Sequence, residues 1–286
     1  MSCIIHQIWL SEDKSLTSEC PPTSFQTTMN RWKSSHPRSQ YILWTDISVE
    51  TLLRNEFGEN ILAFYESLRF LIEKVNFAKY CILYHYGGIY ADGNIECVAD
   101  HETIFRALPE NALFFVENPN SRCLQVTVCY LMASRQQHPF LARIICKCIS
   151  RIKNSCLRSL CTSKTWASYF TGSLLATSCL DGYQDPENKV FILNRSFLFP
   201  QNVWSHMLSR SPFRNEDDIN NDTETTEGTE LLQTSFVQLV SWNPIWSHES
   251  MNRWFFLWRL MSVTLGSVCR KDNESIVRID QWPMSL

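Results

Sequence analysis

The feature that most constrains the fold is a continuous segment, residues 67–96, in which a helical pattern leads through a glycine pair into a strand pattern. Apolar side chains recur at steps of three and four along residues 67–86, which predicts a helix over that range. The pair Gly87-Gly88 ends this helix, and residues 89–92 predict a strand. A helix that turns directly into a strand is typical of an α/β domain.

The remainder of the chain repeats this alternation of strand and helix patterns, and it contains no internal repeat. Strands are predicted at residues 3–10, 40–44, 112–117, 126–133 and 189–199. Helices are predicted at residues 25–35, 48–57, 138–153 and 164–180. We therefore expect an α/β fold with a Rossmann-like mixed sheet flanked by helices, and with helical additions.

The chain has 286 residues, which suits one large domain spanning 1–286. Its core is expected at about residues 1–200, followed by an acidic loop at 214–230 and a Trp-rich segment at 231–286. The acidic loop carries seven acids and one Arg. Because the whole chain has a net charge of −3, the residues outside this loop carry a net charge of +3. No dense basic stripe appears, and nucleic acid is therefore not an expected partner.

The late segments allow more than one interpretation. Residues 214–230 are expected to be mobile, either as a solvated insert or as a lid over a bound ligand. The stretch Trp254–Met261 is apolar nearly all round, which fits a core helix, a contact with a membrane surface or a partner surface. The apolar run around it is interrupted by Arg259 and is too short to span a bilayer, so no transmembrane segment is expected.

The chain contains twelve cysteines, but its first residues show neither a basic region nor a long apolar region of a secretory signal. We interpret the cysteines as reduced thiols of a cytoplasmic protein. They lack the paired spacing of a zinc site, and a cluster of Cys146, Cys148, Cys156 and Cys161 has no accompanying His.

Chemistry-bearing residues gather in the same segment that constrains the fold. Asn76, Lys79 and Tyr80 lie at helical spacing and are expected to be neighbours on one face. The glycine pair can bring backbone close to a ligand. Asp92 and Asn94 follow the strand, with Glu96 two residues further on, and an extended chain would place all three on one side.

Oxygen ligands arranged in this way can hold a hard divalent ion, and the ion can bridge a diphosphate. The carboxyl end of a strand in an open α/β sheet is also the expected binding crevice. The chemistry alone leaves a second interpretation open, in which Asp92, Asn94 and Glu96 form a polar strand end capped by a turn.

The segment Lys74–Glu96 resembles the sugar-binding region of the glycosyltransferases that contain a DXD motif, a group that includes yeast-type initiating mannosyltransferases and the glucosylating clostridial toxins and is similar to glycosyltransferase family 32. Further similarities follow in family order across most of the chain. They are Ile4–Leu10, the block Trp32, Pro37, Tyr41 and Leu43–Asp46, the turn Thr171–Leu175, and the pair His248 and Trp254.

The resemblance implies a GT-A fold, a Mn²⁺ or Mg²⁺ cofactor and a reaction that retains anomeric configuration. It assigns roles to residues as follows. Catalytic roles fall to Asp92, Asn94 and Lys79; donor binding to Gln7, Trp9, Asn76, Lys79, Tyr80, Gly88 and Asp92; and metal binding to Asp92, Asn94 and His248.

Three positions depart from the family pattern. Asn76 and Asn94 stand where the family has Asp, and Lys79 stands where it has Arg. Asn keeps a carbonyl oxygen but loses the charge, so a divalent cation should bind more weakly. Lys lacks the planar fork that Arg offers to paired oxygens. Glu96 is a candidate to supply the missing charge.

These observations predict a metal-assisted hexosyltransferase that uses a UDP- or GDP-sugar and a glycan, lipid or protein acceptor. One rival is a catalytically impaired relative that keeps the fold and binds a nucleotide sugar or a partner, which Asn76 and Asn94 motivate. A second is an effector-like enzyme that modifies a host protein. The absence of an anchor ahead of the first strand favours a cytoplasmic setting, with an effector or viral protein included.

Overall fold

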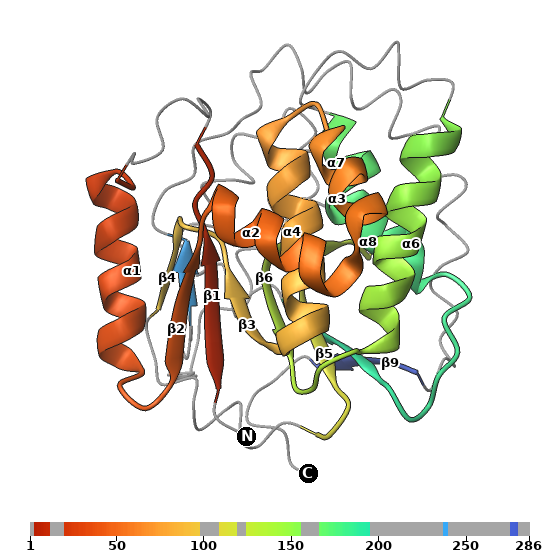
Figure 1. Ribbon diagram of the computed structural model, residues 1–286. Helices are drawn as coiled ribbons and strands as arrows, with labels where there is room; N and C mark the ends of the chain where they lie inside the picture. The colour runs from red at the N-terminus through yellow and green to blue at the C-terminus, as the bar shows by residue number, and fades with distance from the viewer. Residues whose placement is uncertain are drawn as a thin grey trace, which may run out of the picture.

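The computed structural model describes residues 3–11, 20–97, 109–118, 124–155, 166–194, 237–239 and 275–279, the strand at 237–239 by its backbone alone. Within these ranges the chain forms a mixed sheet of seven strands with helices packed on it (Figure 1). The strand order is β2-β1-β3-β6-β5-β7-β9. A separate pair, β4-β8, accompanies this sheet.

The first half of the sheet contains three parallel strands. They are β1 (Ile4–Ile8), β2 (Gln40–Trp44) and β3 (Gly88–Ala91), with β1 in the middle. Strand β6 (Val126–Ala133) runs antiparallel to both β3 and β5 (Leu113–Glu117). Strands β7 (Val190–Leu193) and β9 (Ile276–Ile279) complete the sheet parallel to β5. The mixed sheet confirms the predicted α/β class.

The helices divide between the two faces of the sheet. Helix α1 (Thr23–Ser35) lies with β4 (Ile95–Cys97) on one side, and β8 (Val237–Leu239) pairs with β4. Figure 1 shows the other helices in front of the sheet. They are α2 (Asp46–Leu52), the π-helical turn Leu53–Phe57, α3 (Glu59–Glu66), α4 (Leu71–Tyr86), α6 (Pro139–Asn154), α7 (Ala167–Phe170) and α8 (Ser173–Leu180).

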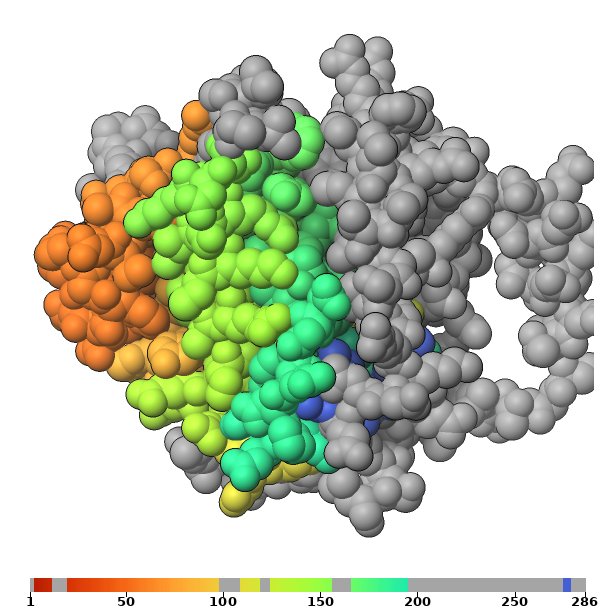
Figure 2. Space-filling model, turned by 90° about the vertical axis from the view of Figure 1, so that its right-hand side faces the viewer, coloured from red at the N-terminus to blue at the C-terminus, as the bar shows by residue number. Residues whose placement is uncertain are grey.

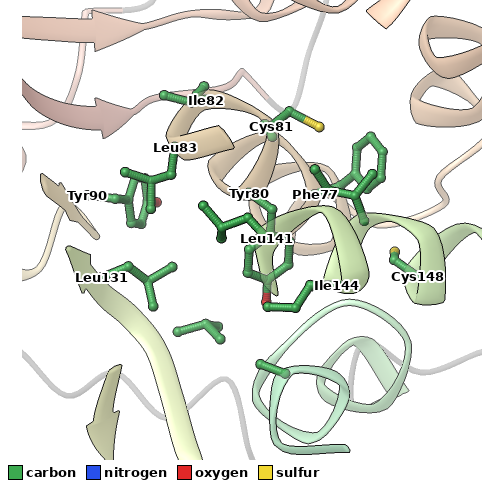
Figure 3. Packing of buried hydrophobic residues seen from close by; sticks show 14 of the residues in the cluster. Phe77, Tyr80, Cys81, Ile82, Leu83, Tyr90, Leu131, Leu141, Ile144 and Cys148 are labelled. Carbon is green, nitrogen blue, oxygen red and sulfur yellow. The ribbon is translucent and has the colours of Figure 1, made fainter. Parts of the chain in front are cut away.

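Side chains alternate between two cores because successive residues of a strand point to opposite faces. In β5, Leu113 and Phe115 join the core under α4 and α6, whereas Phe114 joins the core that Trp32 of α1 covers. Figure 3 shows the larger core, in which side chains of α4 meet Leu141 and Ile144 of α6. In the side view of Figure 2, α6 lies beside the segment that carries α7 and α8.

Several predicted boundaries differ from the structure. The helix predicted at 67–86 begins at Leu71, and α3 precedes it as a separate helix that the sequence analysis did not separate. The helix predicted at 164–180 is broken into α7 and α8 at Thr171 and Gly172, where both backbone N–H groups donate to the carbonyl of Ala167. None of the helices in the described ranges has the length and apolar character needed to cross a membrane.

Candidate functional site

Helix α4 buries polar side chains in an otherwise apolar surface. Asn76, Lys79 and Tyr80 lie at the predicted helical spacing, and their exposed fractions are 4%, 0% and 0%. Burying an amide or an ammonium group is unfavourable unless it finds partners. The partners of these three residues therefore define the site.

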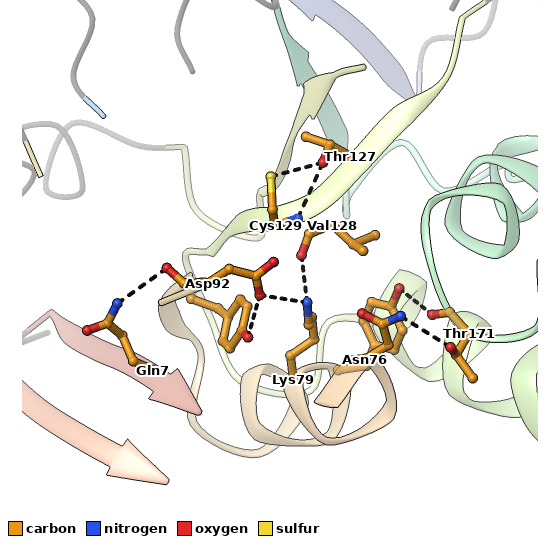
Figure 4. Close-up of polar contacts among 10 residues, drawn as sticks. Gln7, Asn76, Lys79, Asp92, Thr127, Val128, Cys129 and Thr171 are labelled. Atoms are coloured by element: carbon orange, nitrogen blue, oxygen red, sulfur yellow. Dashed lines mark hydrogen bonds and ion pairs between the residues drawn. The ribbon is translucent and has the colours of Figure 1, made fainter. Parts of the chain in front are cut away.

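The Lys79 ammonium group is held at the end of β3 by three contacts (Figure 4). Its Nζ lies 3.0 Å from Asp92 Oδ1 and 3.0 Å from the carbonyl oxygen of Val128 in β6. It also lies 4.6 Å from the centre of the Tyr90 ring. A charged donor that is fully buried can be stable with this set, because an anion, a carbonyl dipole and an aromatic face all compensate its lost hydration.

The Asp92 carboxylate connects this buried pair to the surface. Oδ1 accepts from Lys79 and, at 2.7 Å, from the hydroxyl of Tyr90. Burial and the negative charge of Asp92 raise the pKa of Tyr90 well above its ordinary value, so the phenol stays protonated and donates. The Asp92 side chain is 28% exposed, and no residue in the described ranges donates to Oδ2. One carboxylate oxygen is thus available to a ligand.

The prediction that Asp92, Asn94 and Glu96 alternate along one extended strand is wrong. The chain turns at these residues, because the Ile95 N–H donates to the Asp92 carbonyl at 2.9 Å and closes a β-turn. Asn94 lies in that turn. Glu96 lies beyond it in β4, where its carboxylate pairs with Arg31 of α1. The Glu96 carboxylate is therefore paired with a side chain of α1 and not with the turn at Asp92.

The glycine pair serves the packing of the sheet. Gly87 and Gly88 have φ values of 66° and 92°, which favour glycine. A Cβ on Gly88 would lie 2.3 Å from the carbonyl oxygen of Ile4, so β3 can approach β1 only because this position lacks a side chain. Gly88, a predicted donor-binding residue, is buried against β1.

Buried His6 of β1 also stabilises the close packing of β3 against β1. Trp44 Nε1 donates to His6 Nδ1 at 3.1 Å, so Nε2 carries the ring proton and donates to the Gly87 carbonyl at 3.0 Å. Burial lowers the pKa of His6 to about 4, which keeps the ring neutral. No role was predicted for His6, because the sequence pattern around it shows only a buried strand.

Gln7 and Trp9 reach the turn at Asp92 from β1. Gln7 is fully buried; its Nε2 donates to the Asp92 carbonyl at 3.4 Å, and its Oε1 accepts from the Tyr41 hydroxyl at 2.7 Å. Trp9 packs edge-on against Phe25 with ring centres 5.4 Å apart. Phe25 also covers Gly93, where a Cβ would lie 2.1 Å from the ring. Both predicted residues therefore adjoin the turn, Gln7 directly and Trp9 through Phe25.

The other predicted residues of α4 make neutral contacts. Asn76 Nδ2 donates to Thr171 Oγ1 at 3.2 Å, and the Tyr80 hydroxyl donates to the Thr171 carbonyl at 2.9 Å (Figure 4). The sequence analysis noted Thr171 only as part of a turn similar to one in the family. The role of Tyr90 was missed as well, although its spacing of two residues from Asp92 was a usable signal.

Some predictions concern residues outside the described ranges. They are His248, the acidic loop 214–230, the stretch Trp254–Met261, and Cys156 and Cys161. Among the described residues there is no group of three or more His, Cys, Asp or Glu side chains that could hold a metal ion.

Asp92 and Asn94 nevertheless fit a hard divalent ion by donor type. Oδ2 of Asp92 is available, and Asn94 lies in the same turn. Mg²⁺ and Mn²⁺ prefer such oxygen donors, and Mg²⁺ is commonly bound through one or two carboxylates together with substrate phosphates. Because these two protein donors carry a single charge, we expect them to bind the ion mainly when a diphosphate supplies further oxygen ligands.

The segment that carries this site matches a family model. Residues 22–111 match the model described as "Glycosyltransferase sugar-binding region containing DXD motif", a range that includes α4, β3 and the turn at Asp92. Inositol phosphoceramide mannosyltransferase 1 of Schizosaccharomyces pombe is 35% identical over 97 residues, which is 33% of this chain and 28% of that protein. The chain thus spans less than a third of the length of this curated relative.

Two further similarities are broader and weaker. An uncharacterized glycosyltransferase of Acanthamoeba polyphaga mimivirus is 25% identical over 208 residues, which is 71% of this chain and 74% of that protein. The solved PaToxG glycosyltransferase is 14% identical with a TM-score of 0.45, over 63% of this chain and 68% of that chain. The match to the family model is confined to a segment: residues 22–111 are similar to the glycosyltransferase sugar-binding regions that contain a DXD motif.

Proposed function

We propose that this chain is a glycosyltransferase that moves a hexose from a UDP- or GDP-sugar to a glycan, lipid or protein acceptor, with metal assistance and with retention of configuration. The observation that carries the proposal is the Lys79–Asp92 pair at the end of β3, which leaves one carboxylate oxygen exposed inside the matched family segment. The mixed α/β sheet is compatible with the GT-A fold expected from the resemblance.

In this proposal the nucleotide sugar lies over the turn after β3. Asp92 and Asn94 hold the divalent ion, and His248 remains a predicted further ligand. The ion, when bound, supplies positive charge to the leaving diphosphate. Trp9 adjoins the turn through Phe25 and is positioned to flank the base.

The chain's own residues contribute charge and orientation. Lys79 holds Asp92 by one carboxylate oxygen, so the other oxygen has a defined direction. The buried ammonium group balances the charge of Asp92, so the carboxylate is held at the end of β3 without an unpaired buried charge. Gln7 fixes the backbone of the same residue. An acceptor that attacks from the side of the departing diphosphate requires no protein nucleophile.

The first test is hydrolysis of UDP-glucose, UDP-galactose, UDP-N-acetylglucosamine and GDP-mannose, with Mn²⁺ and with a chelator. The relative from fission yeast is named a mannosyltransferase that acts on inositol phosphoceramide, which makes GDP-mannose and a lipid acceptor the first combination to try. The proposal predicts metal-dependent turnover of one donor.

Two variants locate the activity. Asp92→Asn should abolish turnover, whereas Glu96→Gln should leave it unchanged, because Glu96 pairs with Arg31 outside the turn. Equal losses in both variants would contradict the assignment of the site to Asp92.

The alternative is a catalytically impaired relative that binds a nucleotide sugar or a partner without turnover. It is favoured by the neutral side chains at Asn76 and Asn94, where the family has Asp. Binding of a donor without hydrolysis, with turnover gained in Asn94→Asp, would support this alternative. The cytoplasmic location and the effector or viral setting stay predictions.

A further inference from the structure

The Asn76 amide is held in a defined orientation by Thr171. Asn76 Nδ2 donates to Thr171 Oγ1 at 3.2 Å across the gap between α4 and the break that separates α7 from α8. Figure 4 shows the amide nitrogen on the side of Thr171 and the amide oxygen on the side of Lys79. The two ends of an amide differ in hydrogen-bonding character, so this orientation has chemical consequences.

The hydroxyl of Thr171 determines which end of the amide it meets. A threonine hydroxyl has one proton to donate. Thr171 Oγ1 donates that proton to the carbonyl of Ala167 at 2.9 Å, so only its lone pairs face Asn76. A lone pair requires a donor, and within Asn76 that donor is the NH₂ group. The oxygen of the amide must then point the other way.

Thr171 is itself fixed by its surroundings. It is fully buried, its N–H donates to the carbonyl of Ala167 at 2.8 Å, and its carbonyl accepts from the Tyr80 hydroxyl at 2.9 Å. The next residue, Gly172, leaves room for the contact, since a Cβ there would lie 3.2 Å from Asn76 Nδ2. The backbone, the hydroxyl and the neighbouring glycine therefore all support one orientation of the amide.

The freed end of the amide is an acceptor. No residue in the described ranges donates to Oδ1 of Asn76. It lies one helical turn from Lys79, whose charge is already balanced by Asp92. A neutral acceptor at this position adds no second negative charge to that pair.

We propose that Thr171 is a positioning residue that turns the Asn76 amide so that its oxygen accepts a hydrogen bond from a hydroxyl of the donor sugar. The inference rests on the proposed function for the identity of the ligand. The orientation itself depends only on Thr171 and its hydroxyl.

The test compares Thr171→Val with Thr171→Ser. Valine keeps the shape but has no hydroxyl, so the amide loses the contact that orients it; serine keeps the hydroxyl and serves as the matched control. Dissociation constants are measured for the nucleotide sugar of the four-donor panel that the parent hydrolyses and for its nucleoside diphosphate alone. Thr171→Val should weaken binding of the nucleotide sugar about tenfold, which corresponds to the loss of one hydrogen bond. It should change the affinity for the nucleoside diphosphate less than twofold. Thr171→Ser should bind both like the parent.

Two results would overturn the inference: unchanged affinity for the nucleotide sugar in Thr171→Val, or an equal loss for the sugar-free diphosphate. Melting temperatures show whether each variant is folded.

A second readout separates this inference from the proposed function. With asparagine side chains labelled with ¹⁵N, the Asn76 NH₂ protons should exchange slowly in the parent and in Thr171→Ser, and rapidly in Thr171→Val. If the parent binds none of the four donors, the proposed function fails, and these signals still decide whether Thr171 orients Asn76. Slow exchange that persists in Thr171→Val would contradict the orienting role.

Discussion

Two polar clusters meet on helix α4, one turn apart, and they differ in charge. The charged cluster consists of Lys79, Asp92 and Tyr90, and the neutral cluster consists of Asn76, Tyr80 and Thr171. In the charged cluster a carboxylate reaches the surface, with 28% of its side chain exposed. In the neutral cluster all three side chains are buried, with Asn76 the most exposed at 4%.

This difference in charge shows how one buried helix can support a ligand site. Charge is placed where an ion pair balances it and solvent is near, since an unpaired buried charge is highly unfavourable. Neutral hydrogen bonds are placed further inside, where they fix orientation without a desolvated charge. On this account the charged cluster determines binding of diphosphate and metal, and the neutral cluster determines the contact with the sugar.

The largest effect on turnover is expected for Lys79→Met, which removes the cation of the charged cluster. Asp92 and the Val128 carbonyl lose their donor, and because Asp92 is partly exposed we expect a loss of about 2–3 kcal/mol in the free energy of unfolding. Turnover should fall by at least about 10²-fold. Urea denaturation and donor hydrolysis measure the two effects.

Lys79→Arg is the matched control for this change, because it keeps the charge and supplies the residue type of the family pattern. It should keep more stability and turnover than Lys79→Met. If Lys79→Met left both quantities unchanged, the charged cluster would have no role in either folding or function.

Acid should destabilise the fold as a whole, because His6 of β1 and His138, the N-cap residue of α6, are both buried and neutral. Burial lowers the pKa of His6 to about 4 and that of His138 to about 4, whereas the unfolded chain binds these protons near pH 6.5. Stability is therefore full above about pH 6.5 and is lost as the pH falls toward 4. Each histidine contributes on the order of 3 kcal/mol to this loss.

Urea denaturation between pH 7 and pH 4 tests the acid effect. In His6→Gln, which has no proton to gain, the slope of stability against pH should be shallower across this window. A slope identical to that of the parent would show that His6 does not drive the loss.

The same substitution made once in each cluster sharpens the comparison. Tyr90→Phe removes a hydrogen bond to a carboxylate, and Tyr80→Phe removes one to the Thr171 carbonyl. We expect losses in unfolding free energy of about 1.5 kcal/mol and about 1 kcal/mol, respectively. Turnover should fall about tenfold in Tyr90→Phe and less than threefold in Tyr80→Phe. The reverse order of turnover would contradict the division of roles.

The smallest effect is expected for Gly172→Ala in the neutral cluster. The new Cβ would lie 3.0 Å from Ser168 Cα and 3.2 Å from Asn76 Nδ2, so the neighbours must shift by a few tenths of an ångström. We expect a loss of about 1 kcal/mol in unfolding free energy. Donor affinity should weaken slightly while affinity for the nucleoside diphosphate is retained, and equilibrium binding of both ligands measures the difference.

Much of the fold follows from local patterns in the sequence. The apolar period of α4, the stop at Gly87 and the short apolar strands β1, β2 and β6 are each visible in the sequence, and they are confirmed with small shifts in their bounds. The helical pattern over 164–180 missed the break between α7 and α8, although the resemblance marked a turn at Thr171–Leu175. The pattern also does not show that Thr171 contacts Asn76 and Tyr80. Pattern alone cannot show such a contact.

Local spacing predicts which residues share an element better than it predicts their contacts. Asn76 and Lys79 lie on one helix and are buried, as the spacing predicted, and Lys79 bonds to Asp92 at the end of β3. The alternation of Asp92 with Glu96 was misleading, because a β-turn closed by Ile95 interrupts the strand and Arg31 takes Glu96. Turn formation depends here on Phe25 packing over Gly93, a contact from a distant part of the sequence.

The most direct test of the account is a crystal structure with Mn²⁺ and an intact, non-hydrolysable analogue of the nucleotide sugar that the protein hydrolyses. The account predicts a diphosphate next to Asp92 Oδ2 and a sugar hydroxyl within hydrogen-bonding distance of Asn76 Oδ1, with Lys79 still bonded to Asp92. A donor bound away from the turn after β3, or a sugar that contacts neither Asn76 nor Asp92, would contradict it.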